Sequence, residues 1–193
     1  FDGAQSVVFD SQGNLYVADR YNHRVQVYSL STGSPVYSNT LGITGESGSN
    51  NDHFNNPVRL AVDASDRLYV VERVGDRVQR CDPTGGWSCS TFAGGLSTPN
   101  GVALDSAGNV YIADSNNARL LKCTPAGVCS PLVSSLPGWI TDVVLDSSGD
   151  IYIPDWTYHV VRKFNSSGAS LGIHLGQVNV PYTTSPLLIN YPQ

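Results

Sequence analysis

Four stretches of the chain repeat one pattern of hydrophobic and polar positions. Each begins with a short apolar run, passes through a polar turn of the form Asp-Ser-x-Gly or a close variant, and continues into a second apolar run. β-Branched and aromatic residues fill the second run, as is typical of strands, and Asp, Ser and Gly favour tight turns. Each stretch therefore predicts two strands joined by a turn. The four stretches are residues 7–19, 60–72, 102–114 and 143–155.

The turn at the centre of these stretches requires a residue that accepts a positive φ. Gly13, Gly108 and Gly149 occupy this place in three of them. Asp66 stands there in the second stretch, and an Asp adopts this conformation at modest cost. We therefore expect the same turn in all four.

Two more strands are expected after each stretch. Alternating positions predict a third strand at residues 24–28, 77–81, 119–123 and 160–164. A hairpin and an outer fourth strand follow near residues 36–41, 90–93, 130–133 and 170–175. No segment shows a sustained helical period, so the chain is predicted to be all-β.

The spacing of the repeats indicates the architecture. The aspartates that open the turns, Asp10, Asp63, Asp105 and Asp146, are 53, 42 and 41 residues apart. A period of about 40–45 residues with four strands is typical of β-propeller blades. The first interval is longer because of a Gly/Ser/Asn-rich stretch between Leu41 and Pro57, which predicts a loop insertion.

We predict a β-propeller of four-stranded antiparallel blades. The expected blades cover residues 1–53, 54–96, 97–137 and 138–176, and residues 177–193 form an extended tail or linker.

The run from Gly13 to Val27, Gly-Asn-Leu-Tyr-Val-Ala-Asp-Arg-Tyr-Asn-His-Arg-Val-Gln-Val, resembles the NHL repeat, a propeller-blade repeat. The likeness recurs four times over residues 4–176. It implies that the acid closing each second strand faces an arginine, within or between blades. These would be Asp19 with Arg24, Glu72 with Arg77, and Asp114 with Arg119. Asp155 lacks that arginine, which leaves its partner open.

The number of blades in the complete ring stays open. Propellers of this family commonly have six blades, and the chain supplies four. Residues 189–192 resemble residues 54–57, the lead-in to the second repeat, as if another repeat began there. Three interpretations remain: a compact four-bladed ring, part of a larger propeller, and a modular unit of an extended assembly.

Composition narrows the classes of function. The 193 residues carry a net charge of −5 and only two lysines, so nucleic-acid binding is not expected. No apolar run approaches the roughly 20 residues of a membrane span. The sequence contains no Met and no signal peptide precedes Phe1, and we interpret it as a mature or excised piece.

The four cysteines fall in two pairs that bracket the same hairpin in consecutive repeats. This symmetry predicts the disulfides Cys81–Cys89 and Cys123–Cys129. A metal site is disfavoured, because neither pair has the CxxC spacing and no His lies nearby in sequence. Disulfides imply an oxidising, extracellular compartment.

Asn165-Ser166-Ser167 is a glycosylation sequon in the corresponding hairpin of the fourth repeat. An exposed turn is a place where a glycan attaches. The alternative is that these residues simply form a good turn.

The starts of the innermost strands are expected to line the mouth of the central channel. They supply the candidate binding residues Gln5, Ser6, Arg59, Asn100 and Asp142. No cluster of His, Cys or carboxylates recurs there, so neither a metal nor another cofactor is expected. An ordinary solvated mouth is the alternative, with Arg59 pairing with Asp142.

Aromatic residues add a second candidate surface. Trp139 and Trp156 are expected near the mouth, and together with Trp87 they could form a sugar- or peptide-binding surface. Partial burial between blades is the alternative. His23 and His159 occupy equivalent repeat positions, which favours a structural role between blades.

The last residues suggest how copies could be linked. Residues 177–193 are apolar but interrupted by Pro181 and Pro186, which excludes a long helix. Such a segment could lie along the edge of a neighbouring blade and join protomers.

These observations favour a secreted, non-enzymatic propeller module that serves as a protein-interaction or structural scaffold, including as a unit of an extended extracellular assembly. The alternative is a lyase or hydrolase with its active site at the channel mouth. Some proteins of this fold are lyases that use zinc-bound histidines or a basic catalytic residue, but no such set maps onto this sequence.

Overall fold

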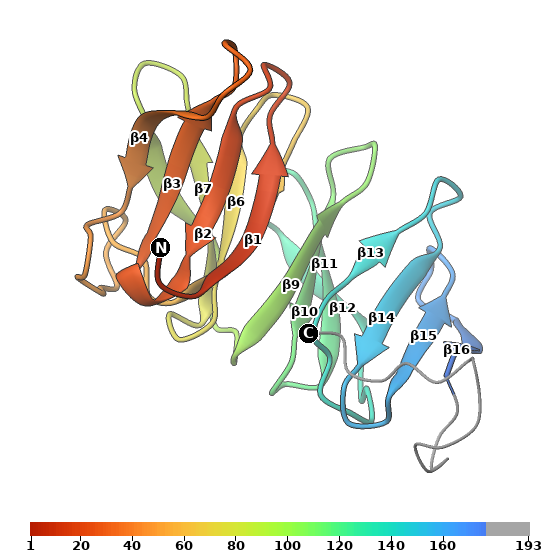
Figure 1. Cartoon of the computed structure of the whole chain (residues 1–193). Coiled ribbons are helices and arrows are strands. Elements are labelled where there is room, and N and C mark those ends of the chain that lie inside the picture. The colour runs from red at the N-terminus through yellow and green to blue at the C-terminus, as the bar shows by residue number, and fades with distance from the viewer. Residues whose placement is uncertain (177–193) are drawn as a thin grey trace, which may run out of the picture. The chain divides into compact units, whose positions relative to one another are not determined.

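The computed structural model describes residues 1–176, and these form four four-stranded antiparallel sheets (Figure 1). In each sheet the strands follow one another in chain order, so every connection joins neighbouring strands. This is the meander of a propeller blade. The predicted fold class is confirmed.

The strand bounds follow the repeat. The first sheet contains β1 (Ala4–Phe9), β2 (Leu15–Asp19), β3 (Arg24–Ser29) and β4 (Val36–Leu41), with a 3₁₀ turn at Arg20–Asn22. The second contains β5 (Pro57–Val62), β6 (Leu68–Glu72), β7 (Arg77–Asp82) and β8 (Ser88–Ala93). The third contains β9 (Pro99–Leu104), β10 (Val110–Asp114), β11 (Arg119–Cys123) and β12 (Cys129–Val133). The fourth contains β13 (Val144–Leu145), β14 (Ile151–Asp155), β15 (Val160–Phe164) and β16 (Ser170–Leu175).

The turn between the first two strands has the predicted conformation. Gly13 has a φ of 79° and Asp66 a φ of 60°, so the Asp of the second repeat adopts the left-handed conformation that Gly adopts in the first. The opening aspartate holds the turn: the amides of Gln12 and Asn14 both donate to Asp10 Oδ1, at 2.9 and 2.8 Å. The turn is thus built by one side chain and one permissive backbone position.

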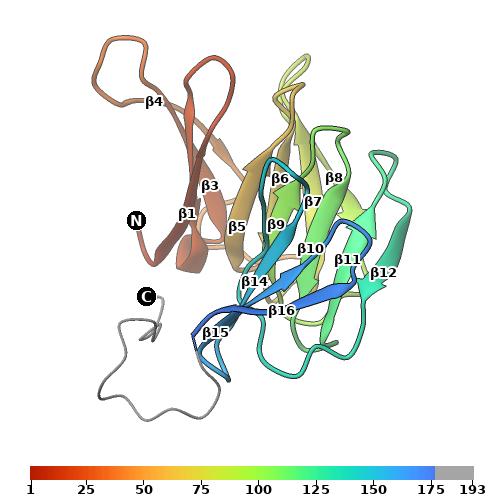
Figure 2. The ribbon, with the colours of Figure 1, turned by 90° about the vertical axis from the view of Figure 1, so that its right-hand side faces the viewer.

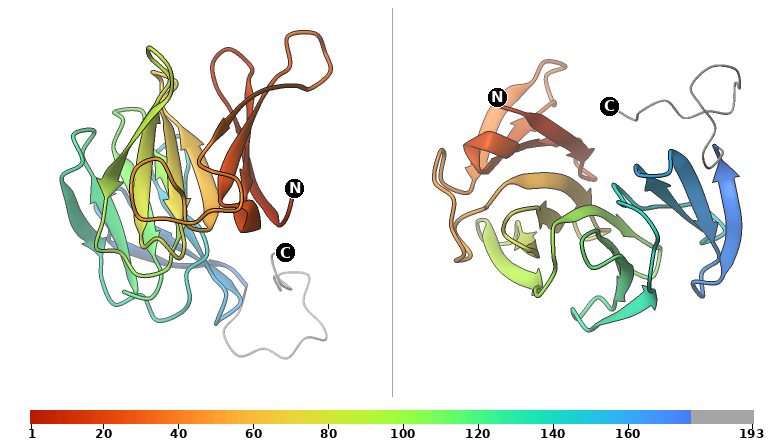
Figure 3. Two further views of the ribbon diagram at one scale, coloured as in Figure 1. Left: turned by 90° about the vertical axis from the view of Figure 1, so that its left-hand side faces the viewer. Right: turned by 90° about the horizontal axis from the view of Figure 1, so that it is seen from below.

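The described residues divide into two compact units, one of residues 1–100 and one that begins at residue 101. In the first, the β1–β4 and β5–β8 sheets lie side by side, with β1 against β5 (Figures 2 and 3). Their core joins one face of each sheet: Tyr16, Ala18, Val25, Val27 and Leu41 pack against Leu60, Leu68, Val70 and Cys81. Alternation along each strand places these residues on the faces that meet.

The second unit has the same construction. Tyr111, Ala113 and Leu120 of the third sheet pack against Ile151, Ile153 and Phe164 of the fourth sheet and against Ile140 and Val143, which precede it in the chain. The shared face shows that successive repeats bury equivalent side chains.

Both predicted disulfides are present. Cys81 is bonded to Cys89 and Cys123 to Cys129. Each cysteine lies directly opposite its partner on the neighbouring strand. They tie the outer strand to the third strand of blades two and three.

Within residues 1–176, no helix is long and apolar enough to cross a membrane. The expected tail at 177–193 lies outside the described residues, and the blade boundaries proposed from the sequence stay a prediction.

Candidate functional site

The buried acids that close the second strands are paired with arginines of the third strands. The arginine Nε lies 2.6–2.7 Å from a carboxylate oxygen in each of the pairs Asp19–Arg24, Glu72–Arg77 and Asp114–Arg119. All three carboxylate side chains are fully buried. The pairs that the resemblance implied are confirmed, and they lie within single blades.

Asp155 also has an arginine partner. Arg162 donates from Nε to Asp155 Oδ2 at 2.9 Å, and its second nitrogen lies 2.8 Å from the same oxygen. Val160 is directly opposite Asp155 in the sheet, and Arg162 lies two residues further along β15. Side chains two residues apart share a face of a strand, so Arg162 reaches the same carboxylate.

The aspartates that open the turns also have a structural use. A tyrosine six residues later donates its hydroxyl to each, at distances of 2.8, 3.3, 3.2 and 3.0 Å in the four blades. Burial alone would raise the pKa of Asp10, but hydrogen bonds from Asn14, Tyr16 and Gln12 outweigh it, and its pKa lies below the usual value. This carboxylate is held in its charged form to organise the turn.

Four of the predicted mouth residues lie in the first unit. Gln5 is exposed at a bulge in β1, and Ser6 beside it is buried. The Ser6 hydroxyl accepts a hydrogen bond from the amide of Leu60 at 3.1 Å, which joins β1 to β5. Arg59 lies half-buried on β5. The side-chain Nδ2 group of Asn100 donates to the Thr98 carbonyl at 3.2 Å. Ser6 therefore connects two blades.

The other three lie in the second unit. Asp142 is half-buried. Its backbone packs closely on Gly101 of β9, where an added Cβ would lie only 2.6 Å from the Asp142 Cα. The Trp156 amide donates to the Trp139 carbonyl at 2.9 Å, and the Trp156 side chain is exposed. The predicted mouth residues are thus divided between the two units, and their common site stays a prediction.

The equivalent histidines are turn residues. His23 and His159 have φ values of 53° and 55°, and Asp76 and Ala118 take the same left-handed conformation at this place. His23 Nδ1 accepts a hydrogen bond from the Asn56 amide at 3.1 Å, so it connects the first blade to the lead-in of the second. Within residues 1–176, no group of three or more His, Cys, Asp or Glu side chains could hold a metal ion.

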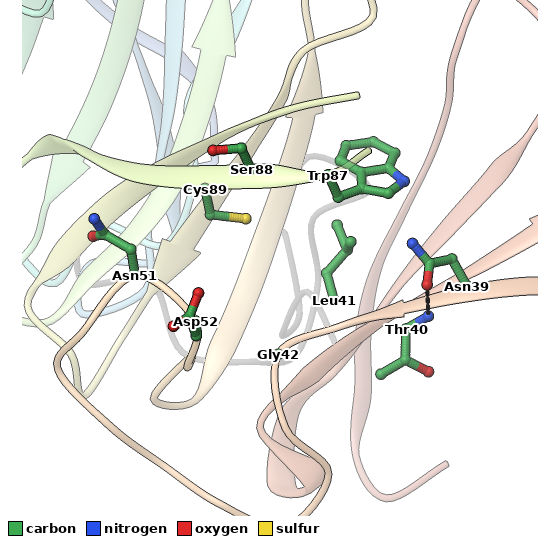
Figure 4. A pocket seen from close by; sticks show the side chains of 9 residues that line it. All are labelled: Asn39, Thr40, Leu41, Gly42, Asn51, Asp52, Trp87, Ser88 and Cys89. Carbon is green, nitrogen blue, oxygen red and sulfur yellow. Dashed lines mark hydrogen bonds between the residues drawn. The ribbon is translucent and has the colours of Figure 1, made fainter. Parts of the chain in front are cut away.

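A groove of about 410 Å³ opens between the outer strands of the first two blades, and we name it the outer groove (Figure 4). The end of β4, the loop at residues 43–56 and the start of β8 form its walls. It is lined by Asn39, Thr40, Leu41, Gly42, Asn51, Asp52, Trp87, Ser88 and Cys89. Its lining combines one aromatic ring with several polar side chains.

Side chains of β7 hold the inserted loop that supplies Asn51 and Asp52. Arg77, already paired with Glu72, also donates to the carbonyls of Ser49, Asn50 and His53. The side-chain Nε2 group of Gln79 donates to the His53 carbonyl at 2.8 Å. A buried guanidinium therefore fixes the backbone of the loop that forms one wall of the outer groove.

Sequence reasoning located the pieces of the outer groove but did not bring them together. It identified the insertion between Leu41 and Pro57 and named Trp87 as a possible binding aromatic. The missing step was the packing of two outer strands from consecutive blades. This packing places the inserted loop beside Trp87, although Asp52 and Trp87 are 35 residues apart in the sequence. A repeat alignment that marks insertions together with aromatic residues of the hairpins could have found it.

Comparisons with known proteins agree with this architecture. The NHL repeat model matches residues 1–28 and 96–123. A structure of a catalytically inactive virginiamycin B lyase from Staphylococcus aureus with quinupristin is similar at a TM-score of 0.71 and 14% identity, covering 93% of this chain and 57% of that one. A gluconolactonase from Xanthomonas campestris is similar at a TM-score of 0.67 and 17% identity, covering 86% and 60%.

A streptogramin B lyase structure is also similar, at a TM-score of 0.70 and 12% identity, covering 88% of this chain and 53% of that one. At these identities the likeness shows the fold alone. The chain spans less than two thirds of the length of each of these proteins. No curated protein matches the sequence.

Proposed function

We propose that this β-propeller chain, whose residues 1–28 and 96–123 match the NHL repeat model, is an extracellular, non-enzymatic interaction module that assembles with further copies through its blade faces. The observation that carries this proposal is apolar surface left open on the first and fourth blades, at positions that neighbouring repeats bury.

The first blade is open on one face of β1. Val7 is 62% exposed and Phe9 is 55% exposed. Leu60 holds the place of Val7 in the second repeat and is only 5% exposed, because it packs into the core against the first blade. The repeat therefore places an apolar residue here for contact with another blade.

The fourth blade is open on the opposite face. Val144 is 53% exposed, whereas its equivalents Val8 and Ala103 are partly buried against the cores of their units. The outer strand β16 adds exposed Leu175, which lies opposite Val161 on the same face. This is the face with which a blade meets the next repeat.

The two open faces are therefore the two halves of one blade interface. A second copy can supply its fourth blade to the first blade, in a head-to-tail contact. Burying an apolar side chain of this size contributes about 1.5–3 kcal/mol, so Val7 and Phe9 together are a substantial part of such a contact.

Sedimentation velocity over a range of concentrations tests the assembly. We expect the wild-type chain to associate as its concentration rises, and the double substitution Val7→Ser and Phe9→Ser to stay monomeric. Val128→Ser is the matched control, because Val128 is an exposed valine in the hairpin of the third blade. A wild-type chain that is monomeric throughout would contradict the proposal.

The extracellular location is supported by the two disulfides, since such bonds persist in oxidising compartments. Native protein should contain no free thiol by alkylation and mass spectrometry. Labelling of all four cysteines in freshly isolated protein would contradict this part of the proposal.

We also propose that Asn165 carries a glycan. It begins the hairpin between β15 and β16, where Ser166 and Ser167 are exposed. The Asn165 Oδ1 atom accepts hydrogen bonds from the amide and the hydroxyl of Ser167, at 3.1 and 2.7 Å. A mass shift on treatment with a peptide N-glycanase, absent from Asn165→Gln, is expected. An unchanged mass of the native protein would contradict it.

The competing function is a lyase or hydrolase with its site at the channel mouth. Similarity in fold to the virginiamycin B lyase and the gluconolactonase favours it. Turnover of a streptogramin or a sugar lactone that is lost on Arg59→Ala or Asp142→Ala would establish this alternative. Absence of turnover in the wild-type chain would favour the interaction module.

A further inference from the structure

We propose that the outer groove binds a neutral saccharide, with Trp87 as the platform for a sugar ring. The inference does not depend on assembly through the blade faces, because every residue of the outer groove lies within the first unit.

Trp87 is held in a defined orientation before any ligand arrives. Its ring meets that of Tyr16 edge to face, with centroids 5.7 Å apart and planes at 75°. Tyr16 is itself buried and donates its hydroxyl to Asp10 at 2.8 Å. Two residues beyond Trp87, Cys89 is tied to Cys81 on the neighbouring strand.

A half-buried indole that is fixed in this way loses little freedom when a ligand packs on it. The C–H face of a pyranose is apolar and its rim carries hydroxyls. It therefore fits a site that sets one aromatic surface beside convergent polar groups.

The polar groups around Trp87 are free to bind hydroxyls. The side chains of Asn51, Asp52 and Ser88 have no hydrogen-bond or ion-pair partner among residues 1–176. Asn39 accepts the Thr40 amide at its Oδ1 atom, at 2.8 Å, which leaves its Nδ2 group as the donor (Figure 4). Amide, carboxylate and hydroxyl groups together supply both donors and acceptors, as a polyol requires.

The wall opposite Trp87 is positioned by buried contacts. Arg77 and Gln79 hold the carbonyls of the inserted loop, and Phe54 at its end is buried in the core of the first unit. The backbone that carries Asn51 and Asp52 is therefore fixed in the unliganded protein.

The corresponding groove of the second unit lacks both a tryptophan and an inserted loop. It lies between the segment 133–137 and the fourth blade, and its lining includes Arg162, Phe164 and Ile173 but no tryptophan. The connection there is short, so no loop equivalent to residues 43–56 supplies amide and carboxylate side chains. The saccharide site therefore follows from the insertion and from Trp87.

Charge selects neutral ligands. The outer groove contains Asp52 and no lysine or arginine, and the whole chain carries a net charge of −5. An anionic sugar would face an unpaired carboxylate, whereas a neutral sugar can donate its hydroxyls to it.

Isothermal titration calorimetry with four neutral oligosaccharides, namely cellotetraose, chitotetraose, maltotetraose and mannotetraose, tests the proposal. Binding of at least one, weakened tenfold or more by Trp87→Ala, is expected. Tyr21→Ala is the matched control, because Tyr21 is an exposed aromatic residue of the first unit that does not line the outer groove, and this variant should bind as the wild type does.

A second variant removes dependence on the packing of Trp87. Asn51 and Asp52 are exposed loop residues, so replacing both with Ala should leave the fold intact and weaken binding of the same oligosaccharide. No binding by any of the four oligosaccharides overturns the proposal, as does binding that survives both variants. Failure here leaves the assembly through Val7 and Phe9 untouched, and a monomeric chain that still binds the sugar would refute only the assembly.

Discussion

Replacing Cys81 and Cys89 with Ala should lower the stability of the first unit by an amount that the length of the bridged segment sets. The bridge spans a sequence separation of 8 residues. The loop-entropy relation then gives about 2.5 kcal/mol of stabilisation at 25 °C. Cys81 is fully buried, so the loss of its sulfur adds the cost of a small cavity.

The second bridge provides the comparison. Cys123–Cys129 spans a separation of 6, for which the same relation gives about 2.2 kcal/mol. For a chain of this size, each kcal/mol corresponds to a shift in Tm of about 2–4 °C. We therefore expect either pair of Ala substitutions to lower the Tm of its own unit by about 5–10 °C.

Thermal unfolding followed by circular dichroism measures the effect. Because the two bridges lie in different units, the double-Ala variant of one pair should leave the transition of the other unit unchanged if the units unfold separately. Midpoints equal to wild type for both variants would refute the reasoning that these bonds constrain the unfolded chain.

Three further predictions concern single features of the blades. Arg162→Leu leaves the Asp155 carboxylate buried without its partner and should cost about 3–5 kcal/mol by urea unfolding; a loss below 1 kcal/mol would mean that this pair is not formed. Ala118→Gly should stabilise by about 0.5–1 kcal/mol, because Ala118 has a φ of 50° that favours Gly, and a lower unfolding midpoint would contradict it. Burial acts to raise the pKa values of Asp10 and Asp105, but hydrogen bonds outweigh burial and hold both pKa values below the usual 3.8. The contribution of these carboxylates to the free energy of unfolding is therefore present above pH 3.8 and is lost as the pH falls below it. Thermal unfolding between pH 5 and pH 2 should show this fall, and Asp10→Asn should make it shallower; an unchanged slope would contradict the assignment.

Much of the fold could be predicted because it is encoded locally and four times over. The Asp-Ser-x-Gly turns, the strand alternation and the cysteine spacing each act within a few residues, and repetition separates them from chance. Even Asp66 could be placed correctly, because the turn needs a left-handed residue and Asp accepts that conformation.

What escaped prediction depends on packing between segments. Arg162 could not be matched to Asp155 from position in the repeat, because it reaches the carboxylate from the next residue on the same face. The outer groove needs two outer strands and an inserted loop to converge, and no local pattern states which side chains then share a wall. Whether the predicted mouth residues act together is likewise a question of packing beyond one unit.

Cysteine cross-linking between the two open blade faces tests the central claim most directly. The double substitution Val7→Cys and Val144→Cys is placed under mild oxidation and analysed by non-reducing electrophoresis and mass spectrometry. Head-to-tail assembly predicts covalent dimers and longer species linked between Val7 of one copy and Val144 of another. Bonds formed only within single chains, or no bond at all at concentrations where the sample is most associated, would contradict the account.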